Sequence, residues 1–284
     1  MSLSLSDGAR ADLVTRHKAA IDGSLRRKLT TVAVMTVLAG LFVYGVSTLE
    51  ISFWKIVKGF GNLGSFVVLM LPPDPGSWAR AGLFVKALFE TIAIAFLGTI
   101  LAAILAFPLG FVAARNVVAN KVVHFLARRS LDTVRGVDAL IWALIWVNVV
   151  GLGPFAGMLA IMTSDLGAFG KLYSEAIEAA DRKPVEGVAS VGGGKFQEIR
   201  FGLIPQVLPV IASQVLYYIE SNTRSSTIIG IVGAGGIGLY LAETIRTLEW
   251  QQVSFLILLV LVAVSVIDVI STRLRFAIIG KRAV

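Results

Sequence analysis

Three long runs without a charged residue constrain the fold of this chain more than any other feature. Leu29–Leu49 contains 21 residues, Thr91–Ala114 contains 24 and Ala139–Ser164 contains 26. A helix that rises about 1.5 Å per residue needs about 20 apolar residues to cross about 30 Å of hydrocarbon. The composition agrees, because 56% of the 284 residues are hydrophobic and only 15% are charged, against about 25% charged in soluble domains. The runs therefore predict an all-α polytopic membrane protein.

We predict six transmembrane helices. The run Ala139–Ser164 is interrupted by Gly151–Gly157 ("GLGPFAG"), and Gly beside Pro marks a turn, so we divide it into two spans. One long helix through this run is the alternative. The predicted spans are Leu29–Leu49, Thr91–Ala114 and residues 137–151, 154–176, 205–231 and 253–272.

These spans divide the chain into four parts. They are a cytoplasmic N-terminal segment (1–28), a first transmembrane helix (29–49), an external loop with an interfacial helix (50–82) and a core transmembrane domain (83–276). A cytoplasmic loop (177–204) interrupts the core domain.

The distribution of positive charge predicts that both termini lie inside. The net charge is +8, and cytoplasmic segments of membrane proteins collect Lys and Arg. Most of the 26 basic residues fall in segments 1–28, 115–136, 177–204 and 273–284. The predicted outer loops hold only Lys55, Lys58, Arg80 and Arg246. This asymmetry removes nucleic-acid binding as the reason for the positive charge.

The chain lacks the residues and motifs that several classes of enzyme and metal site require. The chain has no cysteine and two histidines, His17 and His124, so thiol catalysis and a Cys- or His-rich metal site are excluded. No Walker A, G-x-S-x-G or H-E-x-x-H motif is present. We therefore expect no enzyme activity, no metal and no cofactor in this chain.

Gly233–Gly238 ("GAGGIG") fits the G-x-G-x-x-G pattern of dinucleotide sites. That pattern binds a nucleotide only between a strand and a helix, and here it follows a membrane span. Glycines allow the backbone to reverse and helices to approach closely. We expect either a gate element, with Gly233, Gly235, Gly236 and Gly238 at its close contacts, or a plain glycine turn.

Ionisable residues inside the spans are candidates for a substrate path. Each costs about 2.5–3.5 kcal/mol at the centre of a membrane helix, so it usually faces a partner or water. Glu220 and Arg224 are four residues apart in the order that favours a helical ion pair. Either the pair is only structural, or Arg224 helps an anion across. Asn222, Ser225, Ser226 and Thr227 would then add hydrogen-bond donors. Asp165 is likewise either a satisfied structural group or a pathway residue.

The cytoplasmic loop contains two candidate glutamates. Glu178–Ala180 is a literal Glu-Ala-Ala, while Glu186 is followed by Gly192 and then by "GLIP", which ends at Pro205. The second spacing resembles the signature loop of ABC-importer permeases, E-A-A-x3-G-x9-I-x-L-P. Glu186, Gly192, Ile204 and Pro205 occupy matching columns, whereas Gly187, Val188 and Gly202 depart from the pattern. Glu178 is out of register, so we interpret it as the helical end of the fourth span.

The resemblance extends beyond this loop. The stretches "ETIAIAFLGTILAAILAFPLGFVAARN", "GLGPFAG", "FGKLYSEAIEA", "EIRFGLIPQVLP" and "ESNTRSSTIIGIVGAGGIG" together resemble the phosphonate-importer permeases of the PhnE type. They run in order through roughly residues 90–272. The resemblance implies a type I ABC importer permease with a MetI-like transmembrane fold. Importers of phosphite and related phosphorus oxyanions share such motifs.

The resemblance also implies partners and residue roles. The permease would form a homodimer in a bacterial inner membrane, contact a cytoplasmic ATPase dimer that binds ATP and Mg, and receive phosphonate from an external binding protein. The implied ATPase-coupling residues are Glu186, Gly187, Ser190, Gly192, Lys195, Ile204 and Pro205. The alternatives are a plain cytoplasmic connector for the loop, and for the protein a secondary transporter driven by an ion gradient or a membrane scaffold that moves no solute.

Overall fold

The computed structural model describes residues 18–49, 52–118 and 120–280. The chain divides into two compact units, residues 1–67 and 68–284. Helix α2 (Lys18–Thr48) belongs to the first unit, and its segment Arg27–Thr48 is long and apolar enough to cross a membrane. Helix α3 (Phe53–Leu69) crosses the boundary between the units, which falls between Val67 and Val68. It lies where the sequence predicts an interfacial helix.

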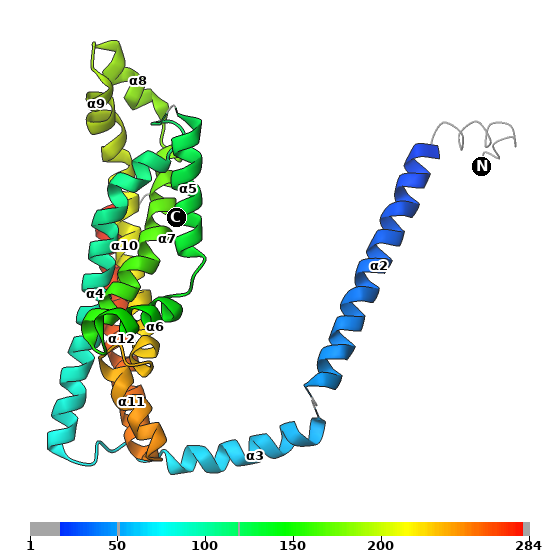
Figure 1. Cartoon of the computed structure of the whole chain (residues 1–284), viewed down its shortest axis with the longest axis vertical. Helices are drawn as coiled ribbons and strands as arrows, with labels where there is room; N and C mark the ends of the chain where they lie inside the picture. Colours follow the sequence, from blue (N-terminus) through cyan, green and yellow to red (C-terminus); the bar gives the residue numbers. More distant parts are fainter. Residues whose placement is uncertain (1–17, 50–51, 119, 281–284) are drawn as a thin grey trace, which may run out of the picture. The chain divides into compact units, whose positions relative to one another are not determined.

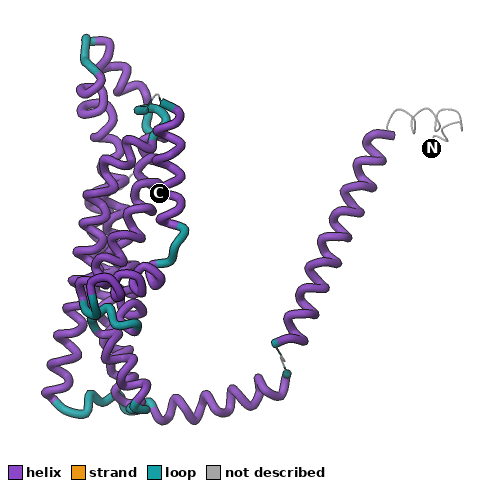
Figure 2. The backbone as a smooth tube through the Cα atoms, in the orientation of Figure 1, coloured by secondary structure: helices purple, strands orange, loops and turns teal. Residues whose placement is uncertain are grey.

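The second unit contains only helices and loops among its described residues (Figures 1 and 2). Its elements are α4 (Trp78–Ala113), α5 (Lys121–Arg135), α6 (Ala139–Val150), α7 (Pro154–Ala179), α8 (Arg182–Ser190), α9 (Lys195–Gln197), the π-helix η1 (Glu198–Leu203), α10 (Ile204–Ile231), α11 (Ile237–Arg246) and α12 (Trp250–Ile279). In Figure 1, α8 and α9 lie at one end of the bundle and α11 lies toward the other.

Helix α7 is the centre of this bundle. It packs against α4, α5, α6 and α10, and the contact with α4 is close because small residues line it. A Cβ atom on Gly98 of α4 would lie 2.9 Å from the side chain of Ile161, and one on Gly110 would lie 2.7 Å from that of Tyr173. Small residues let helix backbones approach in membrane bundles.

Two helices explain why the six predicted spans are not all recovered from apolarity. Helix α6, at the predicted third span, has only 12 residues, and α7 is not apolar enough. Four described helices are long and apolar enough to cross a membrane, or up to five if the bent pair α5 and α6 counts as one span. Helix α7 is outside this set, although it has 26 residues. Asp165 and Lys171 lower its apolarity, and both are satisfied by neighbouring helices. The count of six and the N-in/C-in orientation stay predictions.

The run Ala139–Ser164 is broken where the sequence predicts a turn. Helix α6 ends at Val150 and α7 begins at Pro154, so the alternative of one long helix is wrong. Gly151 and Gly153 between them have φ angles of 92° and 138°, which other residues rarely adopt.

Helix α4 extends beyond its predicted span, and α5 forms where no span is predicted. Helix α4 begins at Trp78, because the Ser77 side chain accepts a hydrogen bond from the Arg80 N–H and caps it. Residues 121–135, expected within an inner segment, form α5 along α7. There the Lys171 ammonium lies 3.1 Å from the Asp132 carboxylate.

Candidate functional site

The predicted coupling loop, residues 177–204, folds into a defined structure at one end of the bundle (Figure 1). The Asp181 side chain accepts a hydrogen bond of 3.0 Å from the Lys183 N–H and caps α8. Helix α8 stops at Ser190, and Gly192 follows with a φ of 86°. The N–H groups of Gly192 and Gly193 then donate to carbonyls at the end of α8. This closure resembles the glycine stops that end many helices.

Close packing holds α8 against η1. A Cβ atom on Gly202 would lie 2.8 Å from the Cα of Val185. Gly202 occupies the isoleucine column of the permease pattern, and its missing side chain lets α8 lie against the backbone of η1. The departure from the pattern therefore has a packing reason.

Gln206 ties the two ends of the loop together. Its side-chain oxygen accepts from the Asp181 N–H at 3.0 Å, and its amide nitrogen donates to the Asp181 carbonyl at 3.0 Å. It also donates to the Gly202 carbonyl at 2.6 Å. A force on α8 would thus pass directly into the start of α10. Sequence reasoning missed Gln206, and its place directly after Pro205 was the only available signal.

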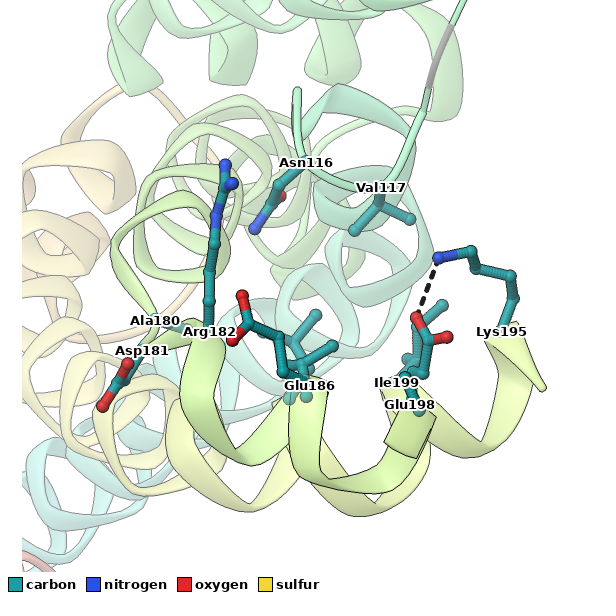
Figure 3. Close-up of a pocket in the computed structure, with 12 residues that line it drawn as sticks. Asn116, Val117, Ala180, Asp181, Arg182, Glu186, Lys195, Glu198 and Ile199 are labelled. Carbon is teal, nitrogen blue, oxygen red and sulfur yellow. Dashed lines mark hydrogen bonds and ion pairs between the residues drawn. The ribbon is translucent and has the colours of Figure 1, made fainter. Parts of the chain in front are cut away.

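The two candidate glutamates have different surroundings. Glu178 is used internally: it accepts a hydrogen bond from the Arg115 N–H at 3.0 Å and pairs with Arg128 at 3.0 Å. Its position within α7 confirms that it is the helical end of that segment. Glu186 is exposed on α8 and lines a pocket of about 360 Å³. Figure 3 shows Glu186, Arg182 and Asn116 pointing toward the same space.

The remaining predicted coupling residues lie on or beside this exposed surface. The Ser190 hydroxyl donates to the Gly187 carbonyl at 2.9 Å, and a Cβ atom on Gly187 would meet no atom within 4 Å. Lys195 pairs with Glu198 at 2.9 Å. Ile204 and Pro205 form the first turn of α10.

The predicted path residues all lie on α10, but on different faces. Arg224 has 55% of its side chain exposed and lies 3.4 Å from the Glu220 carboxylate. Glu220 also receives Arg275 of α12 at 3.4 Å, a partner that sequence spacing could not indicate. Arg224 thus uses one of its five N–H donors on Glu220, while more than half of its side chain stays exposed.

Asn222 and Ser226 face the interior. Asn222 donates to Thr99 of α4 and to Asp165 of α7, and the Ser226 hydroxyl donates to the Asn222 carbonyl at 2.7 Å. Ser225 and Thr227 are half-buried and donate to carbonyls of their own helix. The structure therefore brings the five residues onto two turns of one helix without placing them around one cavity.

Gly233–Gly238 forms a buried turn between α10 and α11, which we call the glycine turn. The Ile237 N–H donates to the Thr91 hydroxyl at 2.7 Å, and the Gly153 N–H donates to the Gly233 carbonyl at 3.0 Å. A Cβ atom on Gly235 would lie 2.7 Å from the nitrogen of Pro154. Neighbouring helices fill the space that a nucleotide would need.

The described residues contain no group of three or more His, Asp or Glu placed to hold a metal ion.

Several known proteins are similar to this chain in sequence or in fold. Residues 106–282 match the family described as "Binding-protein-dependent transport system inner membrane component". The chain is 42% identical over 257 residues to a "Putative phosphite transport system permease protein HtxC" of Stutzerimonas stutzeri, covering 90% of this chain and 89% of that protein. It is 48% identical over 118 residues to a "Putative cryptic phosphonate transport system permease protein PhnE2" of Escherichia coli K12, covering 42% of this chain and 97% of that protein.

A solved structure of the MetNI methionine ABC transporter in an inward-facing conformation has a similar fold. The TM-score is 0.64 at 18% sequence identity, with 71% of this chain and 99% of that chain covered. At this identity the likeness concerns the fold alone.

Proposed function

The chain belongs to the family of binding-protein-dependent transport system inner membrane components, and from that premise we propose that it carries phosphorus oxyanions inward through the membrane. It is the transmembrane permease subunit of an ATP-driven importer for phosphonates or related ions such as phosphite and phosphate. The similar proteins named for phosphite and phosphonate transport support this substrate class.

The observation that carries this proposal is the construction of the coupling loop. Helix α8 is exposed, packed on η1 at Gly202 and tied to α10 by Gln206. An ATPase dimer that binds ATP and Mg would grip α8, and its closure would move α10. Glu186 and Gly187 are exposed on α8, and we assign them, with Ser190, Gly192, Lys195, Ile204 and Pro205, to this contact.

Arg224 supports an anion path beside α10. A guanidinium that is half exposed on a membrane helix is costly unless water or another chain covers it, and its planar fork suits a phosphate-like group. We propose that a second copy of the chain covers this face and that the path runs between the two copies. Asn222, Ser225, Ser226 and Thr227 then shape α10 beside the path, and Gly233, Gly235, Gly236 and Gly238 form its gate.

The same proposal includes the membrane in which the complex lies and the orientation of the chain. The protein lies in a bacterial inner membrane with six spans and both termini inside, and an external binding protein delivers the substrate. A reporter fused at Arg246 should therefore give an external signal; a cytoplasmic signal at this position contradicts the topology.

The proposal is tested with the permease, its ATPase and its binding protein reconstituted in proteoliposomes. We expect phosphonate-loaded binding protein to stimulate ATP hydrolysis and uptake. Glu186→Ala should lower the stimulated rate by about tenfold without lowering the amount of permease in the membrane, because it removes a contact with the ATPase. Lys183→Ala, which changes another exposed charge on α8, is the matched control.

Two outcomes contradict this proposal. Equal losses in both variants, or none, remove Glu186 from the ATPase contact. Uptake that needs an ion gradient and no ATP favours a secondary transporter. Parallel measurements with phosphonate, phosphite and phosphate identify the preferred ion.

A further inference from the structure

A buried polar cluster joins three helices of the second unit. It consists of Thr99 on α4, Asp165 on α7 and Asn222 on α10, whose exposed fractions are 0%, 5% and 8%. These are the helices that form the centre of the bundle. Apolar packing between these helices does not account for buried polar side chains. The cluster therefore requires a separate explanation.

Asn222 is the centre of the hydrogen bonds in this cluster. The Asn222 amide nitrogen donates to the Thr99 hydroxyl at 2.8 Å and to the Asp165 carboxyl. Asp165 is in none of the ion pairs found among residues 18–49, 52–118 and 120–280. Its carboxyl group therefore accepts a hydrogen bond from an uncharged side chain, that of Asn222.

Such a cluster specifies orientation in a way that apolar contacts do not. Burying polar groups costs free energy that their hydrogen bonds offset only when the geometry is right. The Asn222 side chain holds two partners on two different helices, so a rotation of α10 about its axis would break both bonds. Leucine or valine contacts would lose much less in the same rotation, because they are not directional.

Arg224 lies on the opposite side of α10. Two residues correspond to about 200° around a helix with 3.6 residues per turn. This agrees with an exposed side-chain fraction of 55% for Arg224 and a buried Asn222. The Glu220–Arg224 pair lies within α10 and turns with it, so it cannot set the rotation. Arg275 reaches Glu220 from α12 at 3.4 Å, so this ion pair is a second cross-helix contact that a rotation of α10 would disturb.

We propose that Asp165 and Thr99 are positioning residues of the transporter. They hold Asn222, Asn222 sets the rotation of α10, and this rotation aims Arg224 at the substrate path. The inference rests on the path role proposed for Arg224 and adds residues on two other helices that act through it.

The test is substrate uptake by the complete reconstituted complex. Asn222→Asp places a second carboxyl against Asp165, and we expect uptake to fall by about tenfold. Combining Asp165→Asn with Asn222→Asp restores a carboxyl–amide pair, and uptake should return to within about twofold of the unaltered complex. Thr99→Val keeps the shape but removes the hydroxyl, so it gives a milder variant if Asn222→Asp fails to assemble.

The decisive measurement repeats Thr99→Val and Asn222→Asp in an Arg224→Ala background. Residues that act through one another have non-additive effects, so each change should then lower uptake by less than about twofold further. Effects that multiply with the loss from Arg224→Ala overturn the inference and leave a merely structural cluster. Normal uptake by Arg224→Ala alone overturns the path role of Arg224 and this inference with it.

Discussion

The chain has two glycine-rich regions at different places in the bundle. Several glycines of one have open space around them, and those of the other are in close contact with neighbouring segments. In the coupling loop, a Cβ atom added to Gly187, Gly192 or Gly194 would meet no other atom within 4 Å, so the surface around these glycines is open. In the glycine turn, Gly233, Gly235, Gly236 and Gly238 lie where any Cβ atom would collide with a neighbouring helix or loop.

The difference separates a region proposed to contact a partner from one that is held by contacts within the chain. The coupling loop keeps its shape through Gly202 and Gln206, so its outer surface is available to another protein. The glycine turn has no free surface of that kind, because it is wedged against Thr91 and Pro154. Substitutions should therefore affect function in the first region and folding in the second.

The largest effect is expected when this comparison is tested at two glycines with similar φ angles. Gly236 and Gly192 have φ angles of 73° and 86°, so alanine is strained at both. At Gly236 it also collides with Thr91, and we expect Gly236→Ala to lower the stability of the permease by about 3 kcal/mol. Gly192→Ala should cost only about 1 kcal/mol, the backbone strain alone.

Thermal unfolding of the two purified variants in detergent measures this difference. Equal losses of stability would show that backbone strain, and not packing, explains both glycines. The separation of the two regions would then be wrong.

A smaller effect on folding and a clear effect on coupling are expected within the loop itself. Gly202→Ala pushes α8 away from η1 at Val185, so we expect binding-protein-stimulated ATP hydrolysis to fall by about fivefold while the basal rate persists. Gly187→Ala has open space and favours the helix by up to about 1 kcal/mol. A loss of stimulated ATP hydrolysis in Gly187→Ala would therefore report a lost contact with the ATPase and not a change in packing within the loop.

The stimulated and basal rates of both variants, measured in the reconstituted complex, decide between these roles. If Gly202→Ala couples normally, the packing of α8 on η1 is not part of force transmission.

The smallest effect is expected at Lys195. Its side chain is 90% exposed and its pair with Glu198 is an i,i+3 contact at the surface. Such pairs contribute little, about 0–1 kcal/mol, so Lys195→Ala should leave the unfolding temperature of the isolated permease nearly unchanged. A change in stimulated ATP hydrolysis with unchanged stability would place Lys195 in the partner contact, whereas a lower unfolding temperature would make its pair part of the fold.

Much of the fold was predictable because membrane solvation acts on local sequence. Runs such as Thr91–Ala114 indicate helices directly, and glycines around Pro154 indicate the break between α6 and α7. Helix α7 is less apolar than the other spans because it is surrounded by other helices, whose side chains can pair with its charged residues. Gly167 lies against Arg135 and Leu131 of α5, and Lys171 pairs with Asp132.

The candidate site also has a part that local sequence predicted and a part that it did not. The spacing from Glu186 to Gly192 and Pro205 predicted a coupling loop at residues 177–204, and the register alone separated Glu186 from Glu178. Spacing also found the Glu220–Arg224 pair, because i,i+4 neighbours are close on any helix. It could not find contacts that join distant segments.

The sequence by itself determined that this chain is a helical membrane protein and which of its loops resembles a permease coupling loop, because both follow from local composition and spacing. Only the tertiary structure decided that Gln206 closes that loop, that Arg275 shares Glu220 and that Thr99, Asp165 and Asn222 meet. These contacts join segments up to 123 positions apart, and hydrogen bonds depend on a geometry that only the packed helices supply.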